Sequence, residues 1–129
     1  MAHKYIKEII DLEKTPYGWS ENTGRDSRWR EQRRIYGFDE RETWSLDNTF
    51  FYWLYERIKM YDEINIVDTK SDFNKIIFRD KEFTLQDCID FLLENCKTII
   101  LNQGMNDSII EVEKDVLDLW RECYRYLWW

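Results

Sequence analysis

The sequence is short of the residues on which several common kinds of active site depend. It has one histidine, one proline, four glycines and three cysteines among 129 residues. Because His3 is the sole imidazole and lies close to the first residue, histidine-based catalytic triads and histidine-rich metal sites are excluded. No apolar run approaches the roughly 20 residues of a membrane-spanning helix, and no signal-peptide pattern opens the chain. We therefore expect a cytoplasmic protein that does not bind a membrane.

The cysteines are Cys88, Cys96 and Cys123, an odd number without the spacing of a metal site. Reduced thiols in a cytoplasmic protein fit this pattern. Cys88 and Cys96 lie two turns apart among apolar residues, where a free thiol behaves as a small apolar group. The cysteines are therefore predicted to be core residues, and no cofactor is predicted.

Acidic and aromatic residues are plentiful. The net charge of −7 argues against general nucleic-acid binding, although it leaves room for a local basic face. Seven Trp, eight Tyr and seven Phe are more rings than a core of this size can hold. Some rings are therefore expected to line a cleft or a contact surface.

Hydrophobic periodicity predicts one mainly α domain, residues 1–129, built as an irregular bundle of four to five helices. Residues around 74–84 fit either a small β-hairpin or a plain loop. Capping-box spacing is found at Asp39 with Glu42, at Thr84 with Asp87 and at Ser108 with Glu111. The expected helices cover residues 3–15, 25–36, 39–63 and 84–103, and a last helix begins at Ser108 and carries its apolar side as far as Leu127; the second is closed by Gly37, and a bend near Ser45 is one option for the third.

The third helix is expected to bury one apolar phase, consisting of Leu46, Phe50, Trp53, Leu54, Ile58 and Tyr61. The fourth is expected to bury Cys88, Phe91, Leu92, Cys96 and Ile99. The last is expected to bury Ile109, Val112, Val116, Leu119, Trp120, Cys123, Tyr124 and Leu127.

The first candidate site is the charged stretch that precedes the aromatic residues 50–53. Its members are Asp39, Glu40, Arg41, Glu42, Trp44 and Asp47. Helix capping explains Asp39 and Glu42. Arg41, Trp44 and Asp47 are spaced by three, so that they adjoin on a helix surface. A guanidinium, an indole and a carboxylate in a row could grip a flat polar ligand, or they could belong to a buried structural network.

The second candidate is a basic run around Trp29, whose members are Arg25, Arg28, Arg30, Arg33 and Arg34. Guanidiniums beside an indole suit a ligand that carries phosphate. The alternative is that they neutralise the acidic surface of the same fold.

The third candidate is an acidic stripe on the last expected helix. Glu111, Asp115, Asp118 and Glu122 share one face and resemble the magnesium ligands of helical nucleotide hydrolases. A second, weaker acidic row consists of Asp87, Asp90 and Glu94, and a metal site would need the two rows to face each other. The alternative is a solvated face paired with Lys114, Arg121 and Arg125.

The motif GFDERETWSLD at residues 37–47, with Leu117–Trp120 and Tyr126–Trp128, resembles a family. Small uncharacterised proteins of bacteriophages and prophages, chiefly from low-GC Gram-positive hosts, carry a similar GFD(D/E)RETW(N/S)LD motif. The likeness covers roughly residues 36–63 and 109–129, and Glu56 stands where the family has proline. The resemblance implies a small helical viral protein in the host cytoplasm, without an assigned chemistry.

These observations favour a non-enzymatic phage accessory protein, with a counter-defence role as one form. Its partner would be a host defence protein or a nucleotide-derived signal. In the nucleotide version, Trp29 or Trp44 stacks on a base while arginines hold phosphates; the residues assigned to this ligand site are Arg28, Trp29, Arg33, Arg34, Asp39, Arg41, Glu42, Trp44 and Asp47.

Two alternatives stay open. One is a magnesium-dependent nucleotide hydrolase that uses Glu111, Asp115 and Asp118. The other is an acidic DNA-mimic inhibitor. A homo-oligomer is a further possibility, because the terminal Trp128 and Trp129 could seal a subunit contact.

Overall fold

The structure is a computed structural model that describes residues 26–43, 45–71, 75–102 and 107–128. The helix expected over residues 3–15 lies outside this range. The observed fold is mainly helical with one small hairpin, which confirms the predicted class. In chain order the elements are α1 (Asp26–Tyr36), the 3-10 helix η3 (Glu40–Thr43), α2 (Leu46–Ile64), β1 (Ile76–Phe78), β2 (Lys81–Phe83), α3 (Leu85–Leu101), α4 (Asp107–Cys123) and the 3-10 helix η4 (Tyr124–Tyr126).

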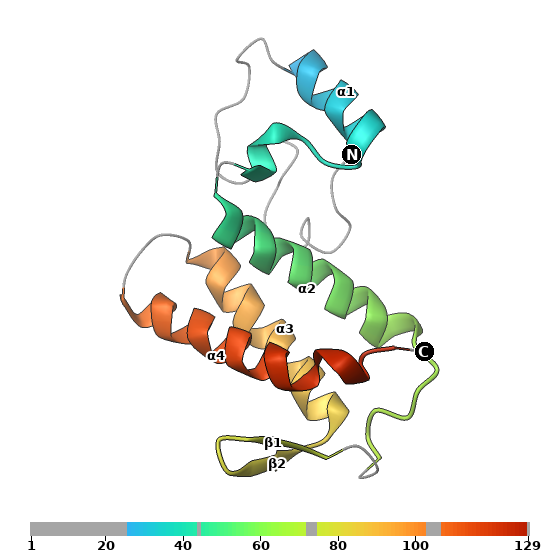
Figure 1. The fold of residues 1–129 in the computed structure, drawn as a ribbon, viewed down its shortest axis with the longest axis vertical. Coiled ribbons are helices and arrows are strands. Elements are labelled where there is room, and N and C mark those ends of the chain that lie inside the picture. Colours follow the sequence, from blue (N-terminus) through green and yellow to red (C-terminus); the bar gives the residue numbers. More distant parts are fainter. Residues whose placement is uncertain (1–25, 44, 72–74, 103–106, 129) are drawn as a thin grey trace.

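The long helices form a bundle in which α3 packs against both α2 and α4 (Figure 1). Helices α2 and α4 run in the same direction. Asp47 in the first turn of α2 acts electrostatically on Glu113 of α4, and at the other end Tyr61 donates a hydrogen bond to the carbonyl of Trp128 at 3.1 Å. Residues 26–43, called the N-terminal lobe below, lie beyond one end of the bundle, and the hairpin lies at the other end (Figure 1).

Helix α1 ends as its sequence predicts. Gly37 has a φ of +84°, and its N–H donates to the carbonyl of Arg33 at 3.0 Å. Glycine adopts this left-handed backbone conformation easily, because it lacks a Cβ atom. Gly37 therefore turns the chain back, so that the residues after it can lie against α1.

The segment around residues 74–84 is a hairpin and not a plain loop. Strands β1 and β2 are antiparallel, with Phe78 opposite Lys81. The two residues of the turn, Arg79 and Asp80, both have positive φ, 51° and 65°, as a type I′ turn requires. Phe78 and Phe83 pack edge-to-face on each other and on Phe91, which attaches the hairpin to α3.

Helix starts follow the predicted capping boxes only in part. At α3 the box is complete, because the Thr84 hydroxyl accepts from the Asp87 N–H at 3.1 Å and the Asp87 carboxylate accepts from the Thr84 N–H at 2.9 Å. Helix α4 begins at Asp107, so Ser108 lies inside the first turn and not at the cap. The single helix expected over residues 39–63 is also wrong, since η3 ends at Thr43 and α2 begins at Leu46.

The core lies where α2, α3 and α4 meet. Its fully buried side chains include Leu54 from α2, Leu92 from α3 and Leu119 from α4. The faces expected for α3 and α4 are largely confirmed, although Tyr124 is exposed. The face expected for α2 is partly wrong, because Leu46 and Trp53 are exposed. The residues that α2 buries are Phe51, Tyr52, Leu54, Tyr55 and Ile58.

All three cysteines are free and buried, as predicted for core residues. Burial raises the pKa of the Cys96 thiol to about 12. The pKa of Cys123 is also raised, first by a hydrogen bond with Cys88 and then by burial. The thiols of Cys96 and Cys123 are therefore protonated near neutral pH, and a protonated thiol is a poor nucleophile.

Candidate functional site

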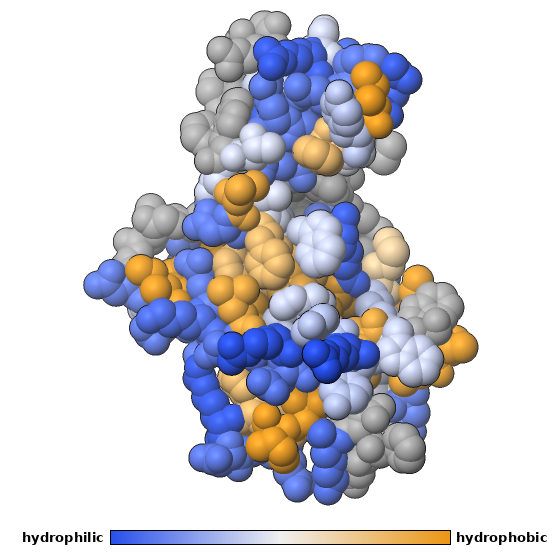
Figure 2. Space-filling model, in the orientation of Figure 1, coloured by the Kyte–Doolittle hydropathy of each residue, from blue (hydrophilic) through white to orange (hydrophobic). Residues whose placement is uncertain are grey.

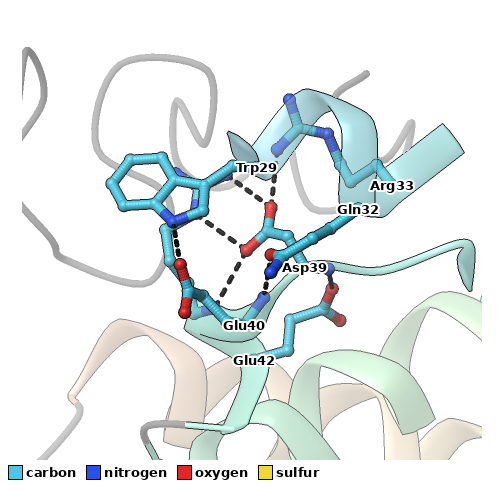
Figure 3. Close-up of polar contacts among 7 residues, drawn as sticks. Trp29, Gln32, Arg33, Asp39, Glu40 and Glu42 are labelled. Atoms are coloured by element: carbon cyan, nitrogen blue, oxygen red, sulfur yellow. Dashed lines mark hydrogen bonds and ion pairs between the residues drawn. The ribbon is translucent and has the colours of Figure 1, made fainter. Parts of the chain in front are cut away.

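The charged stretch of residues 39–42 folds around the carboxylate of Asp39, of which only 2% is exposed (Figure 3). Arg41 donates two hydrogen bonds to this carboxylate, from Nε to Oδ1 at 3.0 Å and from Nη2 to Oδ2 at 2.8 Å. The backbone N–H of Arg41 donates to Oδ1 at 3.0 Å, and Nη1 of Arg33 donates to Oδ2 at 2.6 Å. Two-point contacts between a guanidinium and a carboxylate are among the stronger hydrogen bonds in proteins.

These contacts decide the charge state of Asp39. Burial by itself raises the pKa of the Asp39 carboxyl, but the hydrogen bonds from Arg41 and Arg33 outweigh burial and hold the pKa below its usual range. The carboxylate is therefore ionised near neutral pH. Its charge is needed to balance Arg41, which is itself buried.

Trp29 of α1 also belongs to this network, through contacts with Arg41 and Glu40. The guanidinium carbon of Arg41 lies 4.3 Å from the centroid of the Trp29 ring, within the range of a cation–π contact. The indole N–H donates to Oε1 of Glu40 at 3.0 Å, and Arg28 donates to Oε2 of the same carboxylate at 3.0 Å. The Trp29 ring is buried, so the indole is part of the interior of the N-terminal lobe.

Side chains also bind the backbone of the turn that follows α1 (Figure 3). Oε1 of Gln32 accepts from the Glu40 N–H at 2.8 Å, and Oε2 of Glu42 accepts from the Asp39 N–H at 3.1 Å. The latter contact is half of the predicted capping box. The other half is replaced, because the Asp39 carboxylate accepts from the N–H of Arg41.

Two further predicted ligand residues, Arg34 and Asp47, have other partners than this network. Arg34 is exposed and pairs with Glu31 in its own helix at 2.5 Å. Asp47 accepts from the Ser45 hydroxyl at 2.7 Å, and this hydrogen bond lowers the pKa of its carboxyl. Trp44 lies outside the described residues.

The geometry therefore supports the structural alternative for both the charged stretch and the basic run. Contrary to the expectation of a recognition surface, Trp29 and Arg41 lie inside the lobe. The arginines assigned to phosphate binding each contact a carboxylate of the same chain; the pairs are Arg28 with Glu40, Arg33 with Asp39, Arg34 with Glu31 and Arg41 with Asp39. A phosphate at these guanidiniums would have to displace the chain's own carboxylates.

The acidic stripe of α4 forms ion pairs with an arginine of the hairpin. Nη2 of Arg79, from the hairpin turn, lies 2.6 Å from Asp115 and 3.4 Å from Asp118. These carboxylates raise the pKa of Arg79, chiefly through the hydrogen bond to Asp115. Lys114 pairs with Glu111 at 3.4 Å. The side chain that approaches the stripe is thus an arginine that the sequence reasoning had not singled out.

The second acidic row does not supply the missing half of a metal site. Asp87 caps α3, and Asp90 accepts from Gln86 at 2.9 Å. Within the part of the chain that the structure describes, no group of three His, Cys, Asp or Glu side chains is placed to hold a metal ion. Among the described residues, the acidic stripe is therefore not joined by the convergent carboxylates that the hydrolase alternative requires.

Exposed rings do occur, at the C-terminal end of the described chain. Tyr124 and Tyr126 are exposed, and 70% of Trp128 is open to solvent. Tyr124 packs on Trp120 with 5.8 Å between ring centroids. Two exposed arginines alternate with the aromatic residues in the sequence, Arg121 after Trp120 and Arg125 after Tyr124. We call Arg121, Tyr124, Arg125, Tyr126 and Trp128 the terminal aromatic surface. The alternation of arginine and aromatic residues over 120–128 is the sequence signal that points to it.

Comparison of the chain with protein-family models, with curated proteins and with solved structures finds no match. The resemblance to phage and prophage proteins therefore stays a prediction. Among the described residues, no helix has both the length and the apolar character needed to cross a membrane.

Proposed function

We propose that the chain is a non-enzymatic binding protein and that a partner protein docks on the terminal aromatic surface. The observation that carries this proposal is the exposure of Tyr124, Tyr126 and Trp128 in a stretch of sequence that also contains the exposed Arg121 and Arg125. Tyrosine, tryptophan and arginine are the residues most enriched at the energetic centres of protein interfaces. Trp128 is also held in place, since its carbonyl accepts a hydrogen bond from Tyr61 of α2 at 3.1 Å.

A protein partner fits this surface better than a nucleotide. A nucleotide site in the N-terminal lobe would need free guanidiniums and an open indole face, whereas Arg41 covers Trp29 and binds Asp39. In the terminal aromatic surface, Arg121 is 3.9 Å from both of its carboxylate partners, Asp118 and Glu122. Such long, exposed ion pairs cost little to exchange for contacts with a partner.

The biological setting is taken from the resemblance. If the chain is a phage accessory protein, its partner is a host protein of a low-GC Gram-positive bacterium, and a component of antiviral defence is the natural candidate. The acidic net charge of −7 would favour a partner with a basic face.

The test is quantitative affinity capture from a lysate of such a bacterium. The immobilised protein is compared with a variant that carries Tyr124→Ser, Tyr126→Ser and Trp128→Ser. A matched control carries Ile66→Ser, which removes an apolar side chain elsewhere that is 82% exposed. We expect one protein to be retained by the wild type and the control and lost by the triple variant. Equal retention by all three proteins would contradict the proposal.

Two further measurements separate the alternatives. Mass spectrometry of small molecules released by denaturation would detect a co-purified nucleotide, and loss of that nucleotide on Arg28→Ala would favour the nucleotide site instead. For a DNA mimic, capture should weaken steeply as salt rises and should persist in the triple variant, because exposed charges are screened while aromatic contacts are not.

A further inference from the structure

Helix α2 has a second apolar row, most of which lies on a face that the bundle does not cover, although Phe50 in this row is partly buried and packs against the core. This outer row is spaced by 4, 3, 4, 3 and 4 residues along the helix. Its apolar ends and centre are open to solvent, with exposed fractions of 68% for Leu46, 42% for Trp53, 49% for Met60 and 52% for Ile64. The complete outer row is Leu46, Phe50, Trp53, Arg57, Met60 and Ile64.

The outer row is distinct from the face that builds the core. Leu54 and Ile58 point into the bundle and are buried. A surface helix of a globular protein ordinarily carries polar residues opposite its buried stripe. Alternating steps of three and four residues are the spacing by which one helix packs along another helix. The outer row therefore has the pattern of a helix-packing seam, and Figure 2 shows residues of apolar to intermediate hydropathy along α2, whereas the α4 side of the same face carries many hydrophilic residues.

The spacing of the outer row reads the same in both directions, with its midpoint at the level of Tyr55. A helix with this property can pair with a copy of itself in antiparallel orientation, so that every position meets a position of the same row. In that pairing Leu46 lies opposite Ile64 of the second copy, Phe50 opposite Met60, and Trp53 opposite Arg57.

The one charged residue of the row fits this arrangement. The guanidinium carbon of Arg57 lies 4.8 Å from the Trp53 ring centroid of its own chain, and Nη1 donates to the Trp53 carbonyl at 3.4 Å. Arg57 is thereby held against one indole face. Beside the two-fold axis, it would meet the indole of the second copy as well, and a cation between two rings gains more once water is excluded.

We infer that α2 pairs antiparallel with α2 of a second copy through the outer row, and that the chain forms a symmetric dimer. Among possible occupants of this face, a second copy is favoured because antiparallel pairing about Tyr55 places Arg57 of each copy opposite Trp53 of the other, as a cation–π contact requires. The inference concerns a different surface from the proposed partner site and is tested on the purified protein alone.

The first experiment measures mass in solution by sedimentation velocity across a concentration series. The wild type should reach twice the 16.1 kDa of the chain, and Met60→Glu should lower the dimer affinity at least tenfold. Ile110→Glu is the matched control, an equally exposed apolar residue of α4, and should leave the dimer intact. Circular dichroism checks that both variants remain folded, as expected for changes at exposed sites. A monomeric wild type, or a dimer unaffected by Met60→Glu, would overturn the inference.

The second experiment tests the orientation by cysteine crosslinking. Phe50→Cys and Met60→Cys proteins are mixed under oxidising conditions, the native cysteines being buried. Antiparallel pairing should give a disulfide between the two variants and none within either alone, because residue 50 of the two copies would be about 15 Å apart. Crosslinking of each variant to itself would indicate parallel pairing and overturn the proposed geometry.

Discussion

The N-terminal lobe and the helical bundle are held together by different forces. At the centre of the lobe is an ionised carboxylate, Asp39, bound by Arg33 and Arg41. At the centre of the bundle are apolar side chains such as Leu54, Leu92 and Leu119. An apolar core loses stability in small steps as methyl groups are removed, whereas a buried ion pair becomes unfavourable when one partner is lost.

Among the described elements, the two regions meet chiefly where η3 adjoins the start of α2. Helix α1 packs on η3, and η3 in turn adjoins the start of α2. Figure 1 shows α1 beyond the end of the bundle, away from α3 and α4. Damage to the lobe should therefore stay in the lobe, while damage to the core should be felt by α2, α3 and α4 together.

The largest effect is expected for Asp39→Ala. This change leaves the buried guanidinium of Arg41 without its carboxylate, and breaking a buried pair in this way costs about 3–5 kcal/mol. Residues 26–43 should lose protection in hydrogen exchange, while α3 retains it. Glu31→Ala is the control, since it removes a carboxylate from an exposed pair with Arg34 and should change the stability only slightly.

Acid should have the same effect on the wild type. The folded-state pKa of Asp39 is lowered, so its contribution to stability is complete above the unfolded-state pKa of about 3.9 and is lost as the pH falls through the folded value. As the pH is lowered, residues 26–43 should therefore lose their protection against hydrogen exchange, relative to the intrinsic exchange rate at each pH, before α3 does. Simultaneous loss of protection in both regions would show that they unfold as one unit.

The second effect is expected for Leu92→Ala in α3. Leu92 is fully buried, and removing such a side chain costs about 2–5 kcal/mol through lost burial and the cavity left behind. Here the whole bundle should lose stability, measured as an earlier midpoint in urea. Leu117→Ala is the control, because Leu117 is exposed on α4 and its truncation should be nearly neutral. A loss confined to α3 would contradict a shared core.

The sequence predicted the elements of both regions better than it predicted their faces. Gly37 and the Thr84–Asp87 box act locally, so their residue types alone indicated where helices end and begin. Helix α2 is apolar on two faces, and Leu46 and Trp53 fit a helical period as well as Phe51 and Tyr55 do. Which face meets α3 depends on the partner helix, and the period of one helix does not contain that information.

The same limit applied to the charged residues. The spacing of Asp39 and Glu42 predicted a capping box, of which one half forms, whereas the pairing of Arg41 with Asp39 was not predicted from spacing. The outcome depended on contacts between residues farther apart in the chain, such as Arg28 with Glu40. Likewise, Arg79 reaches Asp115 across 36 positions, so the pairing of the acidic stripe could not be predicted from α4 alone.

The smallest effect is expected for Arg79→Gln, which sharpens the comparison between a buried and an exposed charge. Arg79 contacts Asp115 and Asp118, as Arg41 contacts Asp39, but its side chain is 55% exposed. Water and salt screen such a pair, so its loss should change the stability only slightly. Thermal unfolding at low and high salt should give nearly the same difference from wild type for Asp39→Ala, whereas the small difference for Arg79→Gln should vanish at high salt. A large loss of stability on Arg79→Gln would instead show that the contact between the hairpin and α4 is a major support of the bundle.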